Sequence, residues 1–424
     1  MKRLTLNTVL SQLESRLFGI ILVLCATLAV PAFLIPESSQ AQPSQVSCGA
    51  TITTNTKLNS DLTNCPNEGI VIGADNITLD LNGHSIRGDG TPVASCPDGA
   101  FCDVGIDNTA GHTGVTIKGG SVNGFDIGIV VLSASDNHIQ RISLTDNASF
   151  GMLVGDSHQT LIDHNSAVGD GTSGIVMFNS HDNRIEHNSV TGEHGYAIPV
   201  FGSDHNRLEK NMLDGNDHGI LLDTSNDNEV KGNRISHSGG SSIDIGPAHG
   251  NRIEENVLSD NGDGMVVGNS HDNLISDNTV TGTGFFGFPD TGGYGIILDG
   301  ADHNLIQRNT VTGGRGPSIF ITQLDSPQTS NSNTVSDNVA NSKLTDGILV
   351  DSTASATLLE GNTANANGHD GIHVEAAATT VTRNTANNNH DLGIEAVPGV
   401  IDGGGNHGSG NGNPIQCTNV SCAK

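Results

Sequence analysis

Aliphatic residues recur along the chain at a nearly constant spacing. From position 105 onward a small residue followed by an aliphatic one returns every 22 or 23 residues, except at three longer steps. Self-similarity at such a period is typical of solenoids, in which each repeat packs against its neighbours. The pairs are Gly105-Ile106, Gly128-Ile129, Gly151-Met152, Gly174-Ile175, Ala197-Ile198, Gly219-Ile220, Ser242-Ile243, Gly264-Met265, Gly295-Ile296, Ser318-Ile319, Gly347-Ile348, Gly371-Ile372 and Gly393-Ile394.

Within each repeat, short segments alternate apolar and polar residues, as in Arg184-Ile185-Glu186, between Asn, Gly and Asp turns. Three such strands use about 22 residues, one turn of a triangular coil, and each coil hydrogen-bonds to the next at about 4.8 Å. A column of asparagines runs in phase. We expect it to stack in a turn, in the left-handed conformation, with amides bonded above and below. Its members are Asn165, Asn188, Asn211, Asn233, Asn256, Asn278, Asn309, Asn338, Asn362 and Asn384.

The pattern therefore predicts an all-β fold, a right-handed parallel β-helix of about 13 coils with disulfide-stapled ends. Leucine-rich repeats are excluded because their Leu-rich strand consensus is absent, and calcium-binding nonapeptide repeats are missing too. Left-handed hexapeptide coils have a shorter period. The expected organisation is a signal peptide over 1–41, an N-terminal cap segment over 42–69, the β-helix over 70–410 and a C-terminal disulfide tail over 411–424.

The N-terminus reads as a secretion signal. Lys2, Arg3 and Arg16 precede an apolar run over 18–35, and Ser39-Gln40-Ala41 has the small residues of a cleavage site. We therefore expect a protein that is secreted, to the periplasm or outside the cell. Six cysteines remain after cleavage; they permit fifteen disulfide connectivities, and no CxxC spacing suggests zinc. Neighbour pairing is the preferred hypothesis: Cys48–Cys65, Cys96–Cys102 and Cys417–Cys422.

Two repeats carry a resemblance to a known group. The units over 179–188 and 269–278, Asn-Ser-His-Asp-Asn-Arg-Ile-Glu-His-Asn and Asn-Ser-His-Asp-Asn-Leu-Ile-Ser-Asp-Asn, resemble repeats of pectate-lyase-like right-handed β-helix proteins. They are most similar to the NosD-type, carbohydrate-binding and sugar-hydrolase repeats, and the segment over 77–86 resembles the entry coil of that group. The resemblance covers about residues 70–410. It implies the fold; the group contains lyases, epimerases, hydrolases and proteins without a known reaction.

The charge narrows the set of partners. The net charge is −28 at pH 7, with no Trp and only two Tyr. Such a surface repels nucleic acid and anionic membranes, so neither binding to nucleic acid nor membrane insertion is expected. It also repels acidic polysaccharides unless Ca²⁺ or a local arginine intervenes.

Departures from the period mark the candidate site. Extra residues lie within 282–293 and 322–331, and loops entering from opposite rims of one face would wall a cleft. The floor of the cleft would be the outward residues of that face. Most of them are apolar, which is explained if a loop covers them, if they form an oligomer contact or if they bind a ligand. This column is Val130, Leu153, Val176, Leu221, Asp244, Val266, Ile297, Phe320, Leu349, His373 and Glu395.

The candidate catalytic residues lie near this floor. Arg315 would neutralise a substrate carboxylate, and Tyr294 or His373 would donate or accept a proton at a uronate. Asp370 belongs to a Gly-His-Asp-Gly turn over 368–371 that resembles the Asp-Pro-His-Asp motif of alginate epimerases, without its Asp-Pro half or the preceding Tyr-Gly-Phe. The aromatic residues of the first insertion either bind a sugar face or only cover the apolar outward column. The candidate substrate-binding residues are Phe285, Phe286, Phe288, Ile297, Phe320 and Asp244.

Two metal sites are also considered. Asp351 and Glu375 fall on adjacent coils, where they are solvated or bridged by Ca²⁺, so Ca²⁺ is the one cofactor considered. A loose histidine column beside the Asn turn is better explained as turn filling than as copper ligands, because its offset from the asparagines varies. Its members are His158, His181, His205, His249, His271 and His303.

Three functions are left open. The leading hypothesis is a secreted carbohydrate-active protein that binds or cleaves a polysaccharide, by lyase- or epimerase-like chemistry, in the cleft around Ile297 and Phe320. The alternative is a non-catalytic extracellular structural or interaction module that forms homo-oligomers through its apolar strand face. The third is a NosD-like accessory protein of copper maturation.

Overall fold

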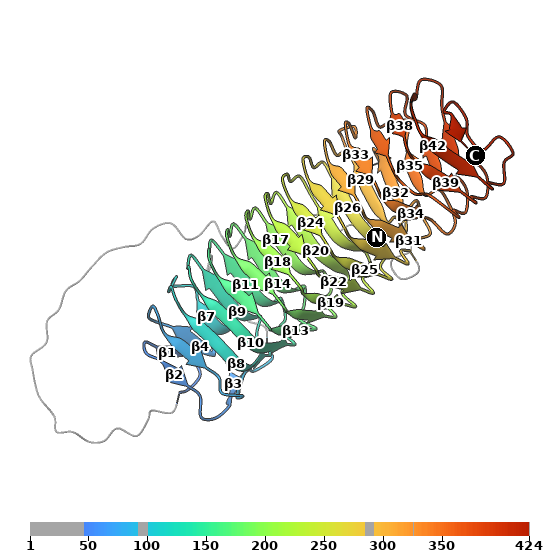
Figure 1. Cartoon of the computed structure of the whole chain (residues 1–424). Helices are drawn as coiled ribbons and strands as arrows, with labels where there is room; N and C mark the ends of the chain where they lie inside the picture. The colour runs from blue at the N-terminus through green and yellow to red at the C-terminus, as the bar shows by residue number, and fades with distance from the viewer. Residues whose placement is uncertain (1–45, 92–100, 285–291, 325, 424) are drawn as a thin grey trace, which may run out of the picture.

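The structure, a computed structural model, describes residues 46–91, 101–284, 292–324 and 326–423. The chain winds into stacked coils that form one elongated rod, with the β1 end in blue and the β42 end in red (Figure 1). The right-handed parallel β-helix predicted from the repeat is confirmed. The signal peptide expected over 1–41 lies outside the described residues. No helix among the described residues is long and apolar enough to cross a bilayer.

One face of every coil contributes a strand to a single parallel sheet, called sheet A. Its register steps by one repeat, as in Ile220 beside Ile243 and Met265 beside Ile296. Sheet A contains β1 (Ala50–Ile52), β4 (Ile70–Ile72), β7 (Val104–Asn108), β9 (Ile127–Leu132), β11 (Phe150–Gly155), β14 (Ser173–Phe178), β17 (Tyr196–Phe201), β20 (His218–Asp223), β23 (Ser241–Ile245), β26 (Asp263–Gly268), β29 (Ile296–Asp299), β32 (Ile319–Thr322), β35 (Ile348–Val350), β37 (Ile372–Val374) and β40 (Ile394–Ala396).

Sheet A has fifteen strands among the described residues, two more than the repeats counted in the sequence. The extra two, β1 and β4, precede the first counted repeat. β4 opens with the same pair, Gly69-Ile70, but this pair stands 36 residues before Gly105, outside the regular period, and β1 has Ala50 where the other strands have a larger aliphatic residue. Because β1 pairs in parallel with β4, regular stacking already begins at Ala50, inside the segment expected as a cap.

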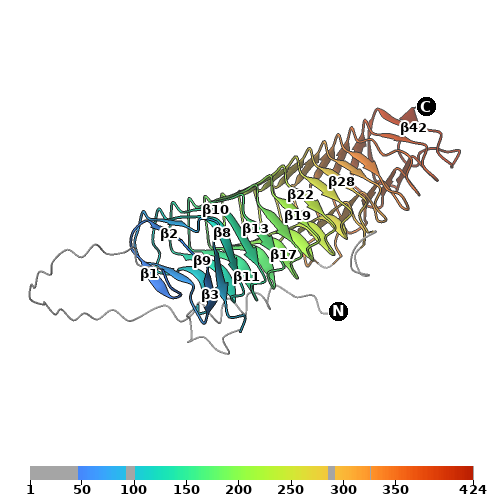
Figure 2. The same cartoon turned by 90° about the horizontal axis from the view of Figure 1, so that it is seen from below.

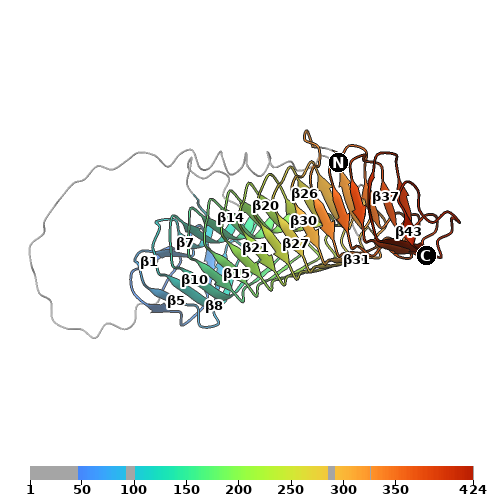
Figure 3. The same ribbon diagram turned by 45° about the horizontal axis from the view of Figure 1, so that its top comes forward.

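The other two faces of the coils carry shorter strands in two ladders that share β8 and β10 (Figures 2 and 3). The first ladder contains β2 (Thr56–Lys57), β5 (Thr78–Asp80), β8 (Thr116–Asn123), β10 (His138–Thr145), β12 (Leu161–Asp163), β15 (Arg184–Glu186), β18 (Arg207–Glu209), β21 (Glu229–Lys231), β24 (Arg252–Glu254), β27 (Leu274–Ser276), β30 (Leu305–Gln307), β33 (Thr334–Ser336), β36 (Leu358–Glu360), β38 (Thr380–Thr382) and β41 (Ile401–Gly404). The second adds β3 (Leu62–Cys65), β6 (Ser85–Gly88), β13 (Ser166–Val168), β16 (Ser189–Thr191), β19 (Met212–Asp214), β22 (Arg234–Ser236), β25 (Val257–Ser259), β28 (Thr279–Thr281), β31 (Thr310–Thr312) and β34 (Val339–Asn341), and near the C-terminus β39 (Thr385–Asn387), β42 (Asn406–Ser409) and β43 (Cys422–Ala423) follow.

The interior of the rod is a stack of aliphatic side chains. Ile220, Ile243 and Met265 from sheet A are fully buried, as are Ile235 and Leu258 from the opposite ladder. Alternation along each strand therefore places one aliphatic set inside, and the outward set is free to carry function.

The asparagine column forms the expected ladder, with one correction. Asn211 donates from Nδ2 to Asn233 Oδ1 at 3.0 Å and to the carbonyl of Ile185 at 2.9 Å, and the pattern repeats along the column. The left-handed residue of the turn, however, is the one before the ladder asparagine, such as Lys210 at φ 54°. The prediction of left-handed asparagines is wrong because the buried amide must face its neighbours, and the outward residue takes the turn.

Disulfides close both ends of the rod. Cys48–Cys65 and Cys417–Cys422 pair as predicted. Cys102 is also disulfide-bonded, and its predicted partner Cys96 lies outside the described residues.

Candidate functional site on the outer face of sheet A

The outward residues of sheet A form a continuous column, as alternation predicted. Val266 lies beside Ile297, Ile297 beside Phe320, and Phe320 beside Leu349. The column continues through His373 to Glu395. The coils interrupted by the two insertions therefore lie side by side, and the column runs from an apolar to a charged end.

The apolar end is tightly packed. Val130, Leu153 and Val176 are fully buried although they point outward, and they pack with Phe178 and Phe201 in a cluster separate from the core.

An aromatic pair occupies the middle of the face. The rings of Tyr294 and Phe320 lie 5.4 Å apart between centroids, tilted by 35°. Phe320 and Ile297 are buried, whereas Tyr294 is partly exposed. Tyr294 donates its backbone N–H to Asp263 Oδ1 at 2.8 Å. Burial, followed by the charge of Asp263, raises the pKa of the Tyr294 phenol, and burial raises the pKa of Asp263 to about 6.

A polar group lies on the N-terminal side of this pair. The hydroxyl of Tyr196 donates to Asp244 Oδ2 at 2.6 Å, and its ring stacks on His218 at 4.6 Å. His218 Nδ1 lies 3.8 Å from the same carboxylate oxygen. Asp244, a predicted substrate-binding residue, is therefore engaged by its own neighbours.

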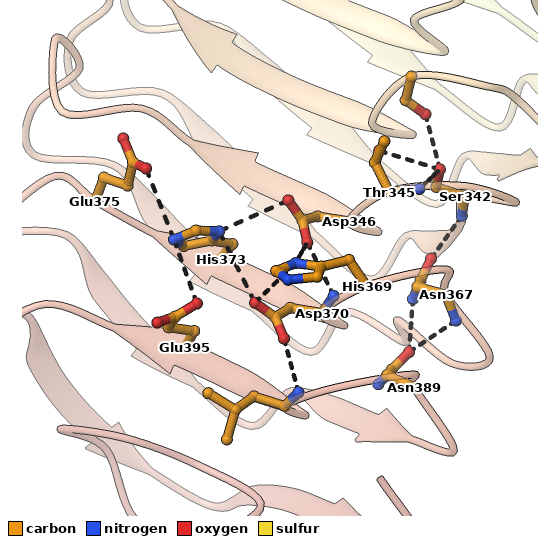
Figure 4. Close-up of polar contacts among 12 residues, drawn as sticks. Ser342, Thr345, Asp346, Asn367, His369, Asp370, His373, Glu375, Asn389 and Glu395 are labelled. Atoms are coloured by element: carbon orange, nitrogen blue, oxygen red, sulfur yellow. Dashed lines mark hydrogen bonds and ion pairs between the residues drawn. The ribbon is translucent and has the colours of Figure 1, made fainter. Parts of the chain in front are cut away.

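Four residues at the charged end, Asp346, His369, Asp370 and His373, form what we call the His–Asp cluster (Figure 4). His369 Nδ1 lies 2.8 Å from Asp346 Oδ1 and 3.2 Å from Asp370 Oδ2. His373 Nδ1 lies 3.6 Å and 3.9 Å from the Oδ2 atoms of the same two carboxylates. The turns before β35 and β37 supply both aspartates, one coil apart.

Two glutamates flank the cluster on its outer side. His373 Nε2 lies 3.8 Å from Glu375 Oε1 and 3.6 Å from Glu395 Oε2. The imidazole of His373 thus lies among four carboxyl groups, as Figure 4 shows.

Burial and pairing shift the protonation of the cluster. A hydrogen bond with Asp346 raises the pKa of both His369 and His373. Burial opposes ionisation of Asp346, but hydrogen bonds from His373, the Asp370 N–H and His369 hold its pKa below the usual value. Burial raises the pKa of Asp370 to about 7. Asp370 is therefore the carboxyl that carries a proton most readily.

The other predicted site residues are placed as follows. Arg315 stands on the turn before β32 and donates to the carbonyl of Gly284 at 3.3 Å. Asp351 and Glu375 are on adjacent coils as expected. Asp351, however, accepts hydrogen bonds from Thr322 Oγ1 at 3.1 Å and the Thr353 N–H at 2.7 Å. The proposed Ca²⁺ pair stays a prediction.

The two insertions differ in what can be described. Phe285, Phe286 and Phe288 lie outside the described residues. In the second insertion the N–H of Leu324 donates to Asp299 Oδ1 at 2.8 Å, and Ser326 Oγ donates to Asn269 at 2.5 Å. This loop therefore folds back along the rim toward earlier coils.

Sequence reasoning found Asp370 and His373 but assigned no role to His369 or to Asp346, which contacts both histidines. The signal was an Asp-Gly step repeated at the same position of adjacent coils, Asp346-Gly347 and Asp370-Gly371. It was overlooked because the acidic residues were sought after the strand-opening glycine. The histidine column adjoins the turns, where His249 stacks on His271 at 5.1 Å. Across the described residues, the His–Asp cluster is the one group of three or more His, Cys, Asp or Glu side chains that lie close enough together to hold a metal ion.

Two sequence families match parts of the chain. The family described as periplasmic copper-binding protein (NosD) matches residues 48–243, and the right-handed β-helix region matches residues 204–344. The His–Asp cluster lies C-terminal to both matches. No curated protein sequence matches the chain significantly.

Solved structures with similar architecture include the A-module of the Azotobacter vinelandii mannuronan C-5 epimerase AlgE4, at 14% identity and TM-score 0.49, covering 83% of this chain and 92% of that one. The periplasmic alginate epimerase AlgG has 16% identity and TM-score 0.46, with coverage of 73% and 82%. DFA-IIIase from Arthrobacter chlorophenolicus A6 has 13% identity and a TM-score of 0.45, and the match covers 63% of this chain and 84% of that one. These similarities are too low to carry a conclusion about function.

Proposed function

We propose, from the premise that this chain is a right-handed parallel β-helix repeat protein, that the outer face of sheet A binds a polysaccharide. We further propose a lyase- or epimerase-like step at a uronate beside the His–Asp cluster. One observation carries this proposal. The Tyr294–Phe320 pair and the cluster lie on the same outward columns, since Phe320, Leu349 and His373 follow one another on adjacent strands.

The spacing of the rod suits an extended sugar chain. Neighbouring coils are about 4.8 Å apart, close to the length of one sugar residue in a polysaccharide. A chain along the face would pass Tyr294 and reach the cluster about two coils later. The apolar face of a sugar ring packs well against an aromatic ring, and the Tyr294 ring is held in place by contact with buried Phe320.

The chemistry needs two kinds of group. Removing the proton beside a uronate carboxylate requires a proton-transfer residue and something that stabilises the developing negative charge. Tyr294 is our candidate for proton transfer, with His373 and Asp370 as further acid–base groups. Arg315, on the turn of the coil that follows Tyr294, is the candidate partner for the carboxylate.

The test is a screen of uronate and neutral polysaccharides for binding and for new unsaturated or reducing ends. We expect Tyr294→Phe to reduce turnover by about 10²–10⁴-fold, the usual contribution of a proton-transfer group, with the melting temperature unchanged. Arg315→Ala should lower both turnover and uronate affinity. The matched control is Tyr196→Phe, which removes the other tyrosine hydroxyl from the same column four coils earlier and should leave turnover within a few-fold.

Each outcome has a clear consequence. Binding without any product would retain the carbohydrate interaction and remove the enzymatic step. A protein that binds neither uronate nor neutral polymers would contradict the proposal and favour an interaction module. Equal losses in both tyrosine variants would contradict the assignment of Tyr294.

A further inference from the structure

The His–Asp cluster and its flanking glutamates hold an excess of negative charge. Four carboxyl groups, including Glu375 and Glu395, surround two imidazoles. Even with both histidines protonated, four ionised carboxylates leave a net negative charge. Like charges gathered at contact distance destabilise a site unless protons or a cation compensate them.

One carboxyl oxygen in the cluster, Asp370 Oδ2, lacks a hydrogen-bond partner. Asp370 is fully buried, and its Oδ1 accepts the Leu392 N–H at 2.7 Å. Its Oδ2 is also buried but has no partner in hydrogen-bonding geometry. This atom is directed at the Nδ1 atoms of His369 and His373, at 3.2 Å and 3.9 Å. A buried carboxyl oxygen without a partner costs free energy, which a proton or a bound cation would recover.

The geometry points to a bound ion. We propose that Asp346, His369, Asp370 and His373 together bind one divalent transition metal ion of the Zn²⁺ type. One ligand atom from each residue lies within 4.8 Å of the other three. Zn²⁺ takes four ligands at about 2.0–2.2 Å in a tetrahedron, so the atoms need to move together only slightly.

The donor set selects the class of metal. Two imidazole nitrogens and two carboxylate oxygens suit Zn²⁺ and its neighbours in the first transition row. Ca²⁺ and Mg²⁺ prefer oxygen ligands throughout, and Ca²⁺ takes six to eight of them. The side chain of His369 is 47% exposed, so it can turn onto an ion entering from solvent, while both aspartates are held in place.

Metal binding does not require a carbohydrate, but the role that we give the ion rests on the proposed function. An ion at the cluster would neutralise the charge of its two aspartates and so reduce the repulsion of a uronate carboxylate on this acidic face. With His373 and Asp370 engaged as ligands, Tyr294 remains as the proton-transfer group.

The test measures metal binding directly, on the purified protein after removal of metal with a chelator. We expect Zn²⁺ to bind at one equivalent per chain in equilibrium dialysis, and Co²⁺ to give the visible absorption of a nitrogen- and oxygen-ligated site. His369→Ala should weaken Zn²⁺ binding by more than the 10–100-fold that loss of an outer-shell partner costs. Because the His369 side chain is about half exposed, we expect this variant to fold as the parent does, and His373→Gln provides a second ligand variant.

The control is His390→Ala, which removes an exposed histidine from the turn one coil further on. It should leave affinity and stoichiometry unchanged. Absence of Zn²⁺ binding, or equal binding by the three variants and the parent, would overturn the metal site. Because no polysaccharide is present, this failure is distinct from that of the proposed function; conversely, Zn²⁺ binding with no glycan binding would uphold the site and remove its proposed role.

Discussion

At the residue scale, the turns of the rod stack one buried polar side chain per coil. In one turn the stack runs from Asn147 through Asp170 and Glu193 to Asn216. Asn147 donates from both its backbone and its side chain to Asp170 Oδ1, at 2.9 Å and 2.8 Å. Asparagine suits this position because it both donates and accepts without charge. The two adjacent carboxyl groups, Asp170 and Glu193, suit it less well, because an ionised carboxylate only accepts hydrogen bonds and the two charges repel each other.

Glu193 is the clearest case. Both of its carboxyl oxygens are buried without a hydrogen-bond partner. Burial, and then the charge of Asp170, raise its pKa from 4.5 to about 8, and burial raises that of Asp170 to about 6. Glu193 is therefore protonated in the folded protein at neutral pH, where the unfolded chain would release the proton.

We predict that stability falls as the pH rises from about 4.5 to about 8 because of Glu193. The folded state holds the proton over this range and the unfolded state does not, so deprotonation favours unfolding. Glu193→Gln should reduce this slope and stabilise the protein at pH 8 by about 1–3 kcal/mol. A smaller slope should remain, because the pKa values of Asp170, Asp263 and Asp370 are also raised. Melting temperatures of parent and variant across this range would check it. Glu255→Gln, which removes an exposed charge, should keep the slope; equal slopes in parent and Glu193→Gln would contradict the prediction.

At this scale, the residue contacts that could be predicted from the sequence were those that recur with the repeat. The ladder asparagines recur at every coil, so their stacking could be predicted. The His–Asp cluster occurs once, and its members come from two turns and one strand. Its contacts depend on which residue types occupy two adjacent turns and one strand at the same time, with Asp346 in one turn, His369 and Asp370 in the next, and His373 on β37. A repeat pattern contains no such information.

At the element scale, the strand register followed from the repeat alone. Each inward aliphatic residue must lie above the previous one, since a shift by one residue would turn the strand inside out. The neighbours of Ile297 and Phe320 could therefore be named in advance. The first two strands, β1 and β4, fall outside this count, because Gly69-Ile70 stands 36 residues before Gly105 and β1 has Ala50 in place of a larger aliphatic residue.

The coil containing β1 to β3 depends on its disulfide. Cys48–Cys65 joins the approach to β1 to the end of β3, across a separation of 17 residues. An end coil has a neighbour on one side only, so it opens more easily than a central coil. A loop of about this length gains roughly 3 kcal/mol from the cross-link.

We predict that the double variant Cys48→Ser/Cys65→Ser loosens this coil locally. Amide exchange in β1, β2 and β3 should accelerate by about 100-fold, the equivalent of that free energy. Exchange in β17 and β20 should not change. Hydrogen exchange read by mass spectrometry separates these segments. Uniform acceleration along the rod would show instead that the coils unfold as one cooperative unit.

At the scale of the whole molecule, the chain carries a net charge of −28, and the proposed sugar-binding face ends among carboxylates. Because the protein is strongly acidic, it repels a polyanion electrostatically. Repulsion between the two extends over the Debye length, about 30 Å at 0.01 M salt and about 10 Å at 0.1 M. Without a bound cation, an acidic polysaccharide therefore approaches against the field of the entire rod.

We predict that metal-free protein binds a uronate polymer such as polygalacturonate more tightly as the salt concentration rises from 0.01 M to 0.15 M. The screened repulsion is the larger effect, because acidic residues outnumber basic ones 46 to 18. Binding of a neutral polymer such as xylan should not depend on salt. With Zn²⁺ in the His–Asp cluster, two negative charges are neutralised and the repulsion is smaller, so uronate affinity should increase and its salt dependence should become weaker. Titration calorimetry in the four combinations of polymer and metal measures this. If uronate affinity instead fell with salt in the metal-free protein, basic side chains such as Arg315 would dominate recognition, and the cluster would not be the group that receives the carboxylate.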